Sequence, residues 1–149
     1  MATIRPVLPH DRTDWVSLRH ALWPDAALDE HERDVDRFLA GDRRGPAEVL
    51  VAFDEQHRAV GFVELSIHNI VDSCSTDRVG YLEGWYVVPD ARRQGIGAAL
   101  VSAGEQWARE QGCREFASDA DLANEASQRA HVALGFTETG RCVRFRKDL

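Results

Sequence analysis

The chain has 149 residues, of which 44% are hydrophobic and 29% are charged, and its formal net charge is −7 at pH 7. This length suits one globular domain with its own core, so we expect a single domain over residues 1–149. The sequence contains no run of about 20 apolar residues such as a membrane span needs, and its acidic balance argues against a nucleic-acid partner.

The first third of the chain predicts one strand followed by two helices. Residues 3–7 have the pattern of a short strand. A helix begins after Asp11 or Thr13, either of which is a suitable N-cap residue. Apolar residues at helical spacing predict a second helix over residues 28–39, and Gly41 is placed to terminate it.

The middle of the chain predicts a sheet followed by a long helix. Residues 49–53 and 60–67 are two apolar runs separated by a polar turn, which is typical of a hairpin. Residues 81–88 form the next strand. An amphipathic helix follows over residues 95–110, and residues 113–118 return as a further strand.

The last part predicts one more helix and one more strand. Asn124 is expected to cap a helix that runs to residue 134, where Gly135 stops it. Residues 141–147 alternate well enough to form the final strand. The order β-α-α-β-β-β-α-β-α-β predicts an α/β fold whose sheet is antiparallel early and parallel around the long helix.

Residues 92–97, Arg-Arg-Gln-Gly-Ile-Gly, are the most informative segment. A glycine-rich turn between a strand and a helix start presents backbone N–H groups to an anion, aided by the helix dipole. Gly95 and Gly97 let a ligand approach the backbone, and Arg92 and Arg93 add positive charge. The segment lacks the Lys-Ser/Thr ending of a P-loop and the glycine spacing of a dinucleotide-binding turn. By itself it is also compatible with an ordinary helix start.

The pattern Arg92-x-x-Gly95-x-Gly97 resembles the acetyl-CoA motif of the GCN5-related N-acetyltransferase (GNAT) family, and the predicted element order resembles that family over the whole chain. The resemblance implies a GNAT-like mixed central sheet with splayed central strands, and acetyl-CoA as the co-substrate. It places the cofactor against Trp85, Tyr86, Val87, Arg92, Arg93, Gln94, Gly95, Ile96, Gly97, Ala98 and Asn124. Asn124 could equally be a simple N-cap, or serve both purposes.

Two carboxylates are candidates for binding or chemistry. Glu83 interrupts an otherwise apolar strand, so it must be paired, solvated in a cleft or functional. A structural alternative is a pair with Arg78 or a buried network. Gly84 beside it indicates a bulge or a close backbone approach. Asp119 ends the following strand, where the same cleft is expected, although it could be an ordinary loop acid.

Several scattered segments resemble the aminoglycoside 6′-N-acetyltransferases within that family. They are Leu-Trp-Pro at 22–24, Leu-Glu-Gly at 82–84, Gly-Cys-Arg-Glu at 112–115, Ala-Ser-Asp at 117–119 and Ala-Leu-Gly-Phe at 133–136. The resemblance implies that Trp23, Glu83 and Asp119 line the aminoglycoside site, and Glu138 is at best a displaced substitute for a further acid. Carboxylates and an indole suit a polycationic sugar, whereas Trp23 alone would be read as a core residue. The chain departs from that group by lacking a Tyr in residues 66–71.

His131 occupies a position where many members of the family carry a Tyr that protonates the CoA thiolate. We therefore count it with Glu83 and Asp119 as a catalytic candidate, although a helical His is often only packed or exposed. No spacing among the other histidines suggests a metal site. The scattered Cys74, Cys113 and Cys142 indicate neither zinc nor disulfides, and no His and Asp arrangement marks a nucleophile.

These features predict an enzyme that transfers an acetyl group from acetyl-CoA directly to the 6′-amine of aminoglycosides and so confers resistance. The alternatives are acetylation of a polyamine, another small amine or a protein N-terminus, or a non-catalytic CoA-binding module. The start of the chain lacks the apolar segment of a signal peptide, and we expect a cytoplasmic protein. The subfamily resemblance also implies a homodimer. No nucleic-acid or membrane partner is expected.

Overall fold

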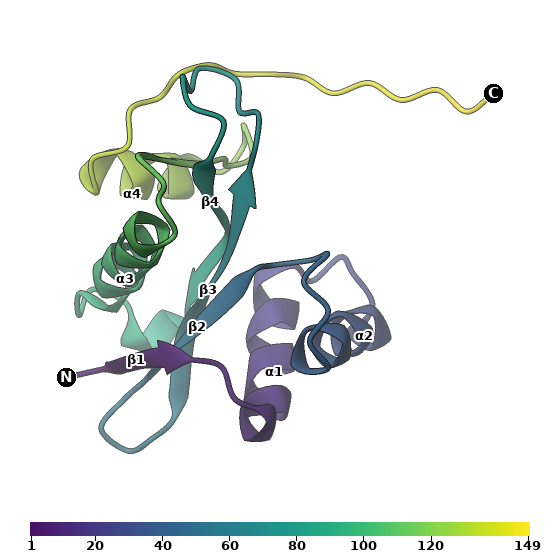
Figure 1. Cartoon of the computed structure of the whole chain (residues 1–149). Coiled ribbons are helices and arrows are strands. Elements are labelled where there is room, and N and C mark those ends of the chain that lie inside the picture. Colours follow the sequence, from purple (N-terminus) through teal and green to yellow (C-terminus); the bar gives the residue numbers. More distant parts are fainter. The chain divides into compact units, whose positions relative to one another are not determined.

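The computed structural model describes all 149 residues, and five strands form one sheet in the order β1-β2-β3-β4-β5 (Figure 1). The strands are β1 (Thr3–Pro6), β2 (Glu48–Phe53), β3 (Ala59–His68), β4 (Val79–Val87) and β5 (Glu115–Ser118). Strands β1 to β4 pair antiparallel with their neighbours, whereas β4 and β5 are parallel. The predicted mixed α/β sheet is therefore confirmed.

Two helices, α1 (Arg12–Leu22) and α2 (Leu28–Leu39), pack on one face of the sheet. Their buried side chains include Trp15 and Phe38, whose rings meet edge to face with centroids 5.3 Å apart. Both belong to a core cluster with Val49 and Val51 of β2, which alternate toward this face. The predicted helix over residues 28–39 is confirmed in full. Gly41 follows it at φ 96°, a conformation that glycine adopts without strain.

Helix α3 (Ile96–Glu110) packs on the opposite face of the sheet. It presents Leu100 and Gly104 to β3: a Cβ on Gly104 would lie 3.0 Å from the Leu65 side chain. Because helices cover both faces, β2 and β3 are buried almost continuously rather than at every second residue.

The expected side-chain cap of the first helix is not formed. Asp11 occupies the N-cap position, but its side chain does not cap the helix. The carboxylate instead accepts hydrogen bonds from Arg5 and from the backbone N–H of Leu8. The Arg5 hydrogen bond is the largest influence on the Asp11 carboxyl and holds its pKa below the ordinary value. The side chain of Asp11 therefore pairs with Arg5 instead of capping α1.

The chain divides into two compact units, residues 1–118 and residues 119–149. The second unit contains one helix, α4 (Glu125–Ala133), and Gly135 follows it at φ 96°. Residues 137–149 form no strand, so the predicted strand over 141–147 is wrong for this structure. A strand requires ladder hydrogen bonds to a neighbour, and alternation in the sequence cannot supply that neighbour. None of the helices is long and apolar enough to cross a membrane.

Candidate functional site

Strand β4 carries one more residue than its partner at Glu83. Glu64 of β3 faces Gly84, but the next β3 residue, Leu65, faces Leu82, so Glu83 has no opposite residue. This irregularity is a β-bulge, and bulges re-aim side chains beside functional sites. The side chain of Glu83 is 36% exposed although its neighbours Leu82 and Gly84 are buried. The bulge therefore accounts for a carboxylate in an apolar strand.

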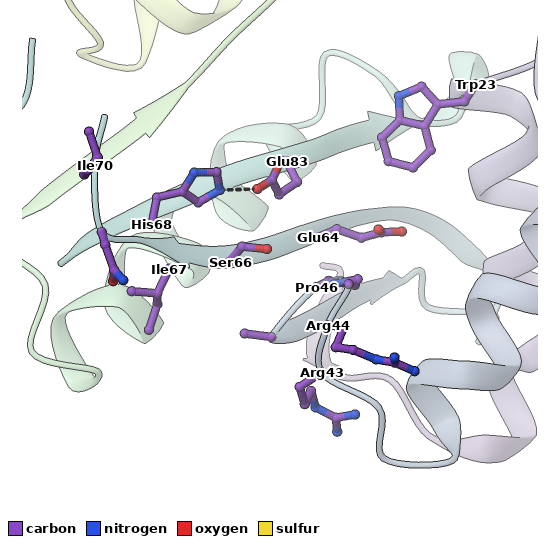
Figure 2. Close-up of a pocket in the computed structure, with 13 residues that line it drawn as sticks. Trp23, Arg43, Arg44, Pro46, Glu64, Ser66, Ile67, His68, Ile70 and Glu83 are labelled. Atoms are coloured by element: carbon purple, nitrogen blue, oxygen red, sulfur yellow. Dashed lines mark hydrogen bonds and ion pairs between the residues drawn. The ribbon is translucent and has the colours of Figure 1, made fainter. Parts of the chain in front are cut away.

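The partner of Glu83 is His68, at the end of β3. Its Nε2 lies 2.6 Å from Oε1 of Glu83, and Figure 2 shows the two side chains directed at each other. The His68 ring also stacks on Tyr81 of β4, with centroids 4.3 Å apart and planes 21° from parallel. Arg78, the alternative partner for Glu83, instead donates from Nε to the carbonyl oxygen of Gln111.

Trp23 lies just after α1 and packs on Gly84. A Cβ at position 84 would lie 2.6 Å from Cη2 of the indole, so only glycine leaves room for this contact. The guanidinium of Arg19 lies 5.1 Å from the centroid of the Trp23 ring. The ring of His31 stacks on the same indole, with the ring centroids 6.5 Å apart. Gly84 thus permits a close approach, and the group that approaches it is the indole of Trp23. An approach of the cofactor to this glycine stays a prediction.

A cavity of about 680 Å³ opens over this part of the sheet (Figure 2). Its volume is within the usual range of small-molecule sites. It is lined by Trp23 after α1, by Arg43, Arg44, Gly45, Pro46 and Ala47 of the loop before β2, by Glu64, Ser66, Ile67 and His68 of β3, by Asn69 and Ile70, and by Glu83 of β4. Two of the expected substrate residues, Trp23 and Glu83, are therefore brought together.

A second carboxylate, Glu64, lies in the wall of the cavity and is almost completely buried, with 3% of its surface exposed. It accepts a hydrogen bond from Nε1 of Trp15, and its Oε2 lies 3.2 Å from Nε of Arg19. Burial raises the pKa of the Glu64 carboxyl to about 7, although Arg19 and Trp15 oppose this effect. Sequence reasoning missed Glu64, yet a carboxylate within the apolar strand 60–65 was the signal already used for Glu83.

The cavity also has two arginines in its wall, and both already have partners. The guanidinium of Arg44 contacts both carboxylate oxygens of Asp42, and this hydrogen bonding holds the pKa of Asp42 well below its ordinary value. Arg43 lies over the Phe38 ring at 3.8 Å and donates to the Phe38 carbonyl oxygen. Asp42 thus compensates the charge of Arg44, whereas the partners of Arg43 are neutral groups.

The glycine-rich turn connects β4 to α3 through a short 3₁₀ turn at Pro89–Ala91. Gly95 is the N-cap of α3 at φ 80°, and Arg93 also adopts a left-handed conformation at φ 64°. Arg92 donates from Nε to the carbonyl oxygen of Val87 at 2.8 Å. A Cβ on Gly97 would lie 3.3 Å from the Trp85 indole. The turn thus opens a 15-residue helix, whose first N–H groups have no partners within the helix.

The parallel ladder between β4 and β5 is short. It begins at Val79 with Glu115 and ends at Leu82 with Ser118, while β4 continues to Val87. The ladder ends because β5 ends at Ser118, so the last residues of β4 have no partner in β5, and the expected splay of the central strands stays a prediction. Trp85, Tyr86 and Val87, the expected pantetheine contacts, all lie in this last part of β4.

The remaining candidates lie in the unit of residues 119–149. Asp119 is exposed. Asn124 is the N-cap of α4 and accepts a hydrogen bond from the N–H of Ser127 at 3.1 Å. Nδ1 of His131 lies 2.7 Å from the carbonyl oxygen of Ser127, so Nδ1 carries a proton and donates it. Glu138 is exposed and forms an ion pair with Arg141.

Comparison with known proteins gives a consistent result. The model of the Acetyltransferase (GNAT) family matches residues 15–136. The chain is 51% identical over 146 residues to an aminoglycoside N(6′)-acetyltransferase type 1 of Klebsiella aerogenes, covering 98% of this chain and 96% of that protein. It is 40% identical to the protein of the same description from Serratia marcescens, with coverages of 96% and 97%.

Solved structures agree with the sequence relatives. The aminoglycoside N-acetyltransferase AAC(6′)-Iy in complex with CoA superposes with a TM-score of 0.90 at 35% identity, covering 100% of this chain and 96% of that chain. AAC(6′)-Ih from Acinetobacter baumannii superposes with a TM-score of 0.90 at 37% identity, with coverages of 100% and 99%. The matched family model, the sequence relatives and the glycine-rich turn at the start of α3 lead to one conclusion. The chain belongs to the GNAT family of acetyltransferases.

Proposed function

We propose that this enzyme transfers the acetyl group of acetyl-CoA to the 6′-amino group of aminoglycosides and thereby confers resistance to these antibiotics. The observation that carries the proposal is the cavity holding Trp23, Glu64 and Glu83, because carboxylates and an indole form a site for a polycationic sugar. The 51% identical relative, an aminoglycoside N(6′)-acetyltransferase, supports this choice of acceptor.

The co-substrate is acetyl-CoA, and we assign its pyrophosphate to the turn Arg92, Arg93, Gln94, Gly95, Ile96, Gly97 and Ala98. Backbone N–H groups at the start of α3 and the helix dipole favour an anion there. The pantetheine arm is assigned to Trp85, Tyr86 and Val87, where β4 has no partner in β5. Asn124 is assigned to CoA as well as to the cap of α4. The solved structure of AAC(6′)-Iy with CoA supports the presence of such a site.

The acceptor is assigned to Trp23, Glu83 and Asp119, with Glu138 as a weaker candidate because Arg141 already pairs with it. Ionised carboxylates orient an ammonium by charge-assisted hydrogen bonds. During the reaction, the amine loses a proton and its nitrogen attacks the thioester carbonyl carbon. The C–S bond then breaks, and the CoA thiolate takes up a proton.

We assign the protonation of the thiolate to His131. Because Nδ1 donates to the Ser127 carbonyl oxygen, neutral His131 is an acceptor at Nε2. It can therefore deliver a proton from Nε2 only as the imidazolium. A role as general acid therefore requires that His131 be charged when the thiolate leaves.

We further propose that the enzyme is a cytoplasmic homodimer. The three cysteines are free, which suits a reducing compartment. In the extended segment of residues 137–149, Val143 is 70% exposed and Phe145 is 93% exposed, and a second copy would remove this apolar surface from water. Light scattering should give twice the mass of 16.7 kDa. A monomer at micromolar concentration would contradict the dimer.

The decisive experiment is turnover with acetyl-CoA and kanamycin, followed through the released CoA thiol. Thiol release must depend on the antibiotic, and mass spectrometry should place one acetyl group on the 6′-nitrogen. A parallel panel of spermidine, small amines and peptides tests other acceptors. Faster turnover of a panel amine than of kanamycin would overturn the assigned acceptor, and no thiol release with any amine would overturn the assigned activity.

A further inference from the structure

His68 lies at hydrogen-bond distance from Glu83, and chemistry limits how that contact can form. An unprotonated imidazole nitrogen and a carboxylate oxygen each present a lone pair, so they repel at short range. Their separation of 2.6 Å therefore requires one proton between Nε2 and Oε1. With Glu83 ionised, His68 donates from Nε2, and the second oxygen of Glu83 remains an acceptor for another donor.

The contact is organised by the fold. The bulge at Glu83 turns its side chain out of the buried strand, and the end of β3 brings His68 to meet it. Tyr81 fixes the plane of the imidazole by stacking at 4.3 Å. Both members of the pair are more than one-third exposed, so without this contact Glu83 would be free to adopt several rotamers. Because His68 already restricts the rotamers of Glu83, a ligand that binds this carboxylate pays less conformational entropy.

We propose that His68 is a positioning residue for the acceptor: it holds Oε1 of Glu83 so that the other carboxylate oxygen receives the substrate's ammonium group. The inference rests on the proposed aminoglycoside acceptor. It also gives the cavity a charge that depends on pH. The pair carries a charge of −1 when His68 is neutral and no net charge when His68 is protonated.

The other charged groups around the pair belong to β3, β4 and the loop before β2. Glu64 of β3 shares the cavity wall, Tyr81 stacks on the imidazole, and the loop contributes Arg43 and Arg44. Both arginines keep their charge throughout the accessible pH range. Protonation of His68 would remove the net negative charge of the pair, so it is expected to weaken binding of a cationic acceptor.

Two substitutions separate the hydrogen bond from the stacking. His68→Gln places an amide N–H donor where Nε2 stands but removes the ring and the titration. His68→Phe keeps a ring on Tyr81 but removes the donor. The KM for kanamycin, the KM for acetyl-CoA and kcat should be measured for both variants and the wild type from pH 5.5 to 8.5, with kanamycin affinity by calorimetry in parallel.

We expect His68→Phe to raise the kanamycin KM about 3- to 10-fold at pH 8, because Glu83 is no longer held in one rotamer, with kcat and the acetyl-CoA KM little changed. His68→Gln should keep a KM near that of the wild type at pH 8, and its KM should rise less than the wild-type KM as the pH falls.

The opposite order, with His68→Phe near wild type and His68→Gln impaired, would show that only the stacking matters and would overturn the proposal. Superimposable pH profiles for all three proteins would overturn it as well. If the wild type turns over another amine but neither binds nor acetylates kanamycin, the acceptor assignment fails. The same profiles measured with that amine then decide the role of His68 separately.

Discussion

The glycine-rich turn at residues 92–97 and the cavity around Glu83, to which we assign the cofactor and the acceptor, are built in different ways. The turn offers backbone N–H groups at the start of α3, so its specificity for an anion comes from a local conformation. The cavity offers side chains that come from the end of α1, the loop before β2, and strands β3 and β4. The turn is therefore formed by six consecutive residues, whereas the cavity forms only when the fold brings together four segments that are distant in the sequence.

Glu83 and Glu64, two carboxylates on neighbouring strands, differ in their surroundings. Glu83 is lifted out of the sheet by a bulge and pairs with a titratable imidazole. Glu64 stays inside the wall beside Arg19 and Trp15, where burial raises the pKa of its carboxyl to about 7. Burial therefore disfavours the charge on Glu64, and the more exposed Glu83 is the stronger candidate for holding an ammonium group.

Blocking the turn should give the largest effect and should spare the cavity. In Gly97→Arg the new side chain starts 3.3 Å from the Trp85 indole and fills the approach to the backbone N–H groups. Loss of two charge-assisted hydrogen bonds would weaken acetyl-CoA binding roughly 100-fold or more. Gly140→Arg is the matched control, because nothing lies within 4 Å of a Cβ at that position. Unchanged acetyl-CoA affinity by calorimetry in folded Gly97→Arg would refute the assigned phosphate site.

His131→Phe should affect neither binding region and should lower kcat instead. A general acid contributes about 10²- to 10⁴-fold, so kcat should fall by roughly 100-fold while both ligands bind normally. The alkaline limb of the wild-type kcat profile should also flatten, since only protonated His131 can donate from Nε2. A near-normal kcat across the pH range would identify His131 as a packing residue.

Neutralising Glu83 or Asp119 should weaken binding of the cationic acceptor and should not weaken binding of acetyl-CoA. Each charge-assisted hydrogen bond contributes about 1.5–3 kcal/mol, so Glu83→Gln and Asp119→Asn should each raise the KM for kanamycin about tenfold or more. Acetyl-CoA affinity should stay at the wild-type level. Equal losses for the two ligands would mean that these acids support the fold rather than the site.

The last effect is expected on stability, from Glu64→Gln. The carboxyl has a pKa of about 7 in the folded chain against an ordinary 4.5, so folding takes up a proton between these values. The free energy of unfolding therefore falls as pH rises from about 4.5 to 7, by roughly 3 kcal/mol at most. Glu64→Gln removes this dependence, and the exposed Glu110→Gln should retain it. Thermal melts at pH 5, 6, 7 and 8 compare the slopes. Parallel slopes for Glu64→Gln and the wild type would show that Glu64 stays ionised.

Sequence patterns determined the elements that depend on near neighbours. Helix α2 was predicted over its full length, and Gly41 and Gly135 follow their helices with positive φ values, as their positions indicated. The turn at 92–97 was found because its chemistry is that of consecutive residues. The close approach at Gly84 was also foreseen, since a glycine within a strand has few other uses.

Tertiary structure decided everything that depends on a distant partner. The sequence could not tell that Asp11 pairs with Arg5 rather than with its own helix, or that residues 141–147 find no strand to join. It could not show that one extra residue in β4 turns Glu83 toward His68, or that Arg19 and Trp15 enclose Glu64. The physical reason is range: turns and caps are fixed by local dihedral angles, whereas the charge of a carboxyl group depends on whichever residues the fold packs around it.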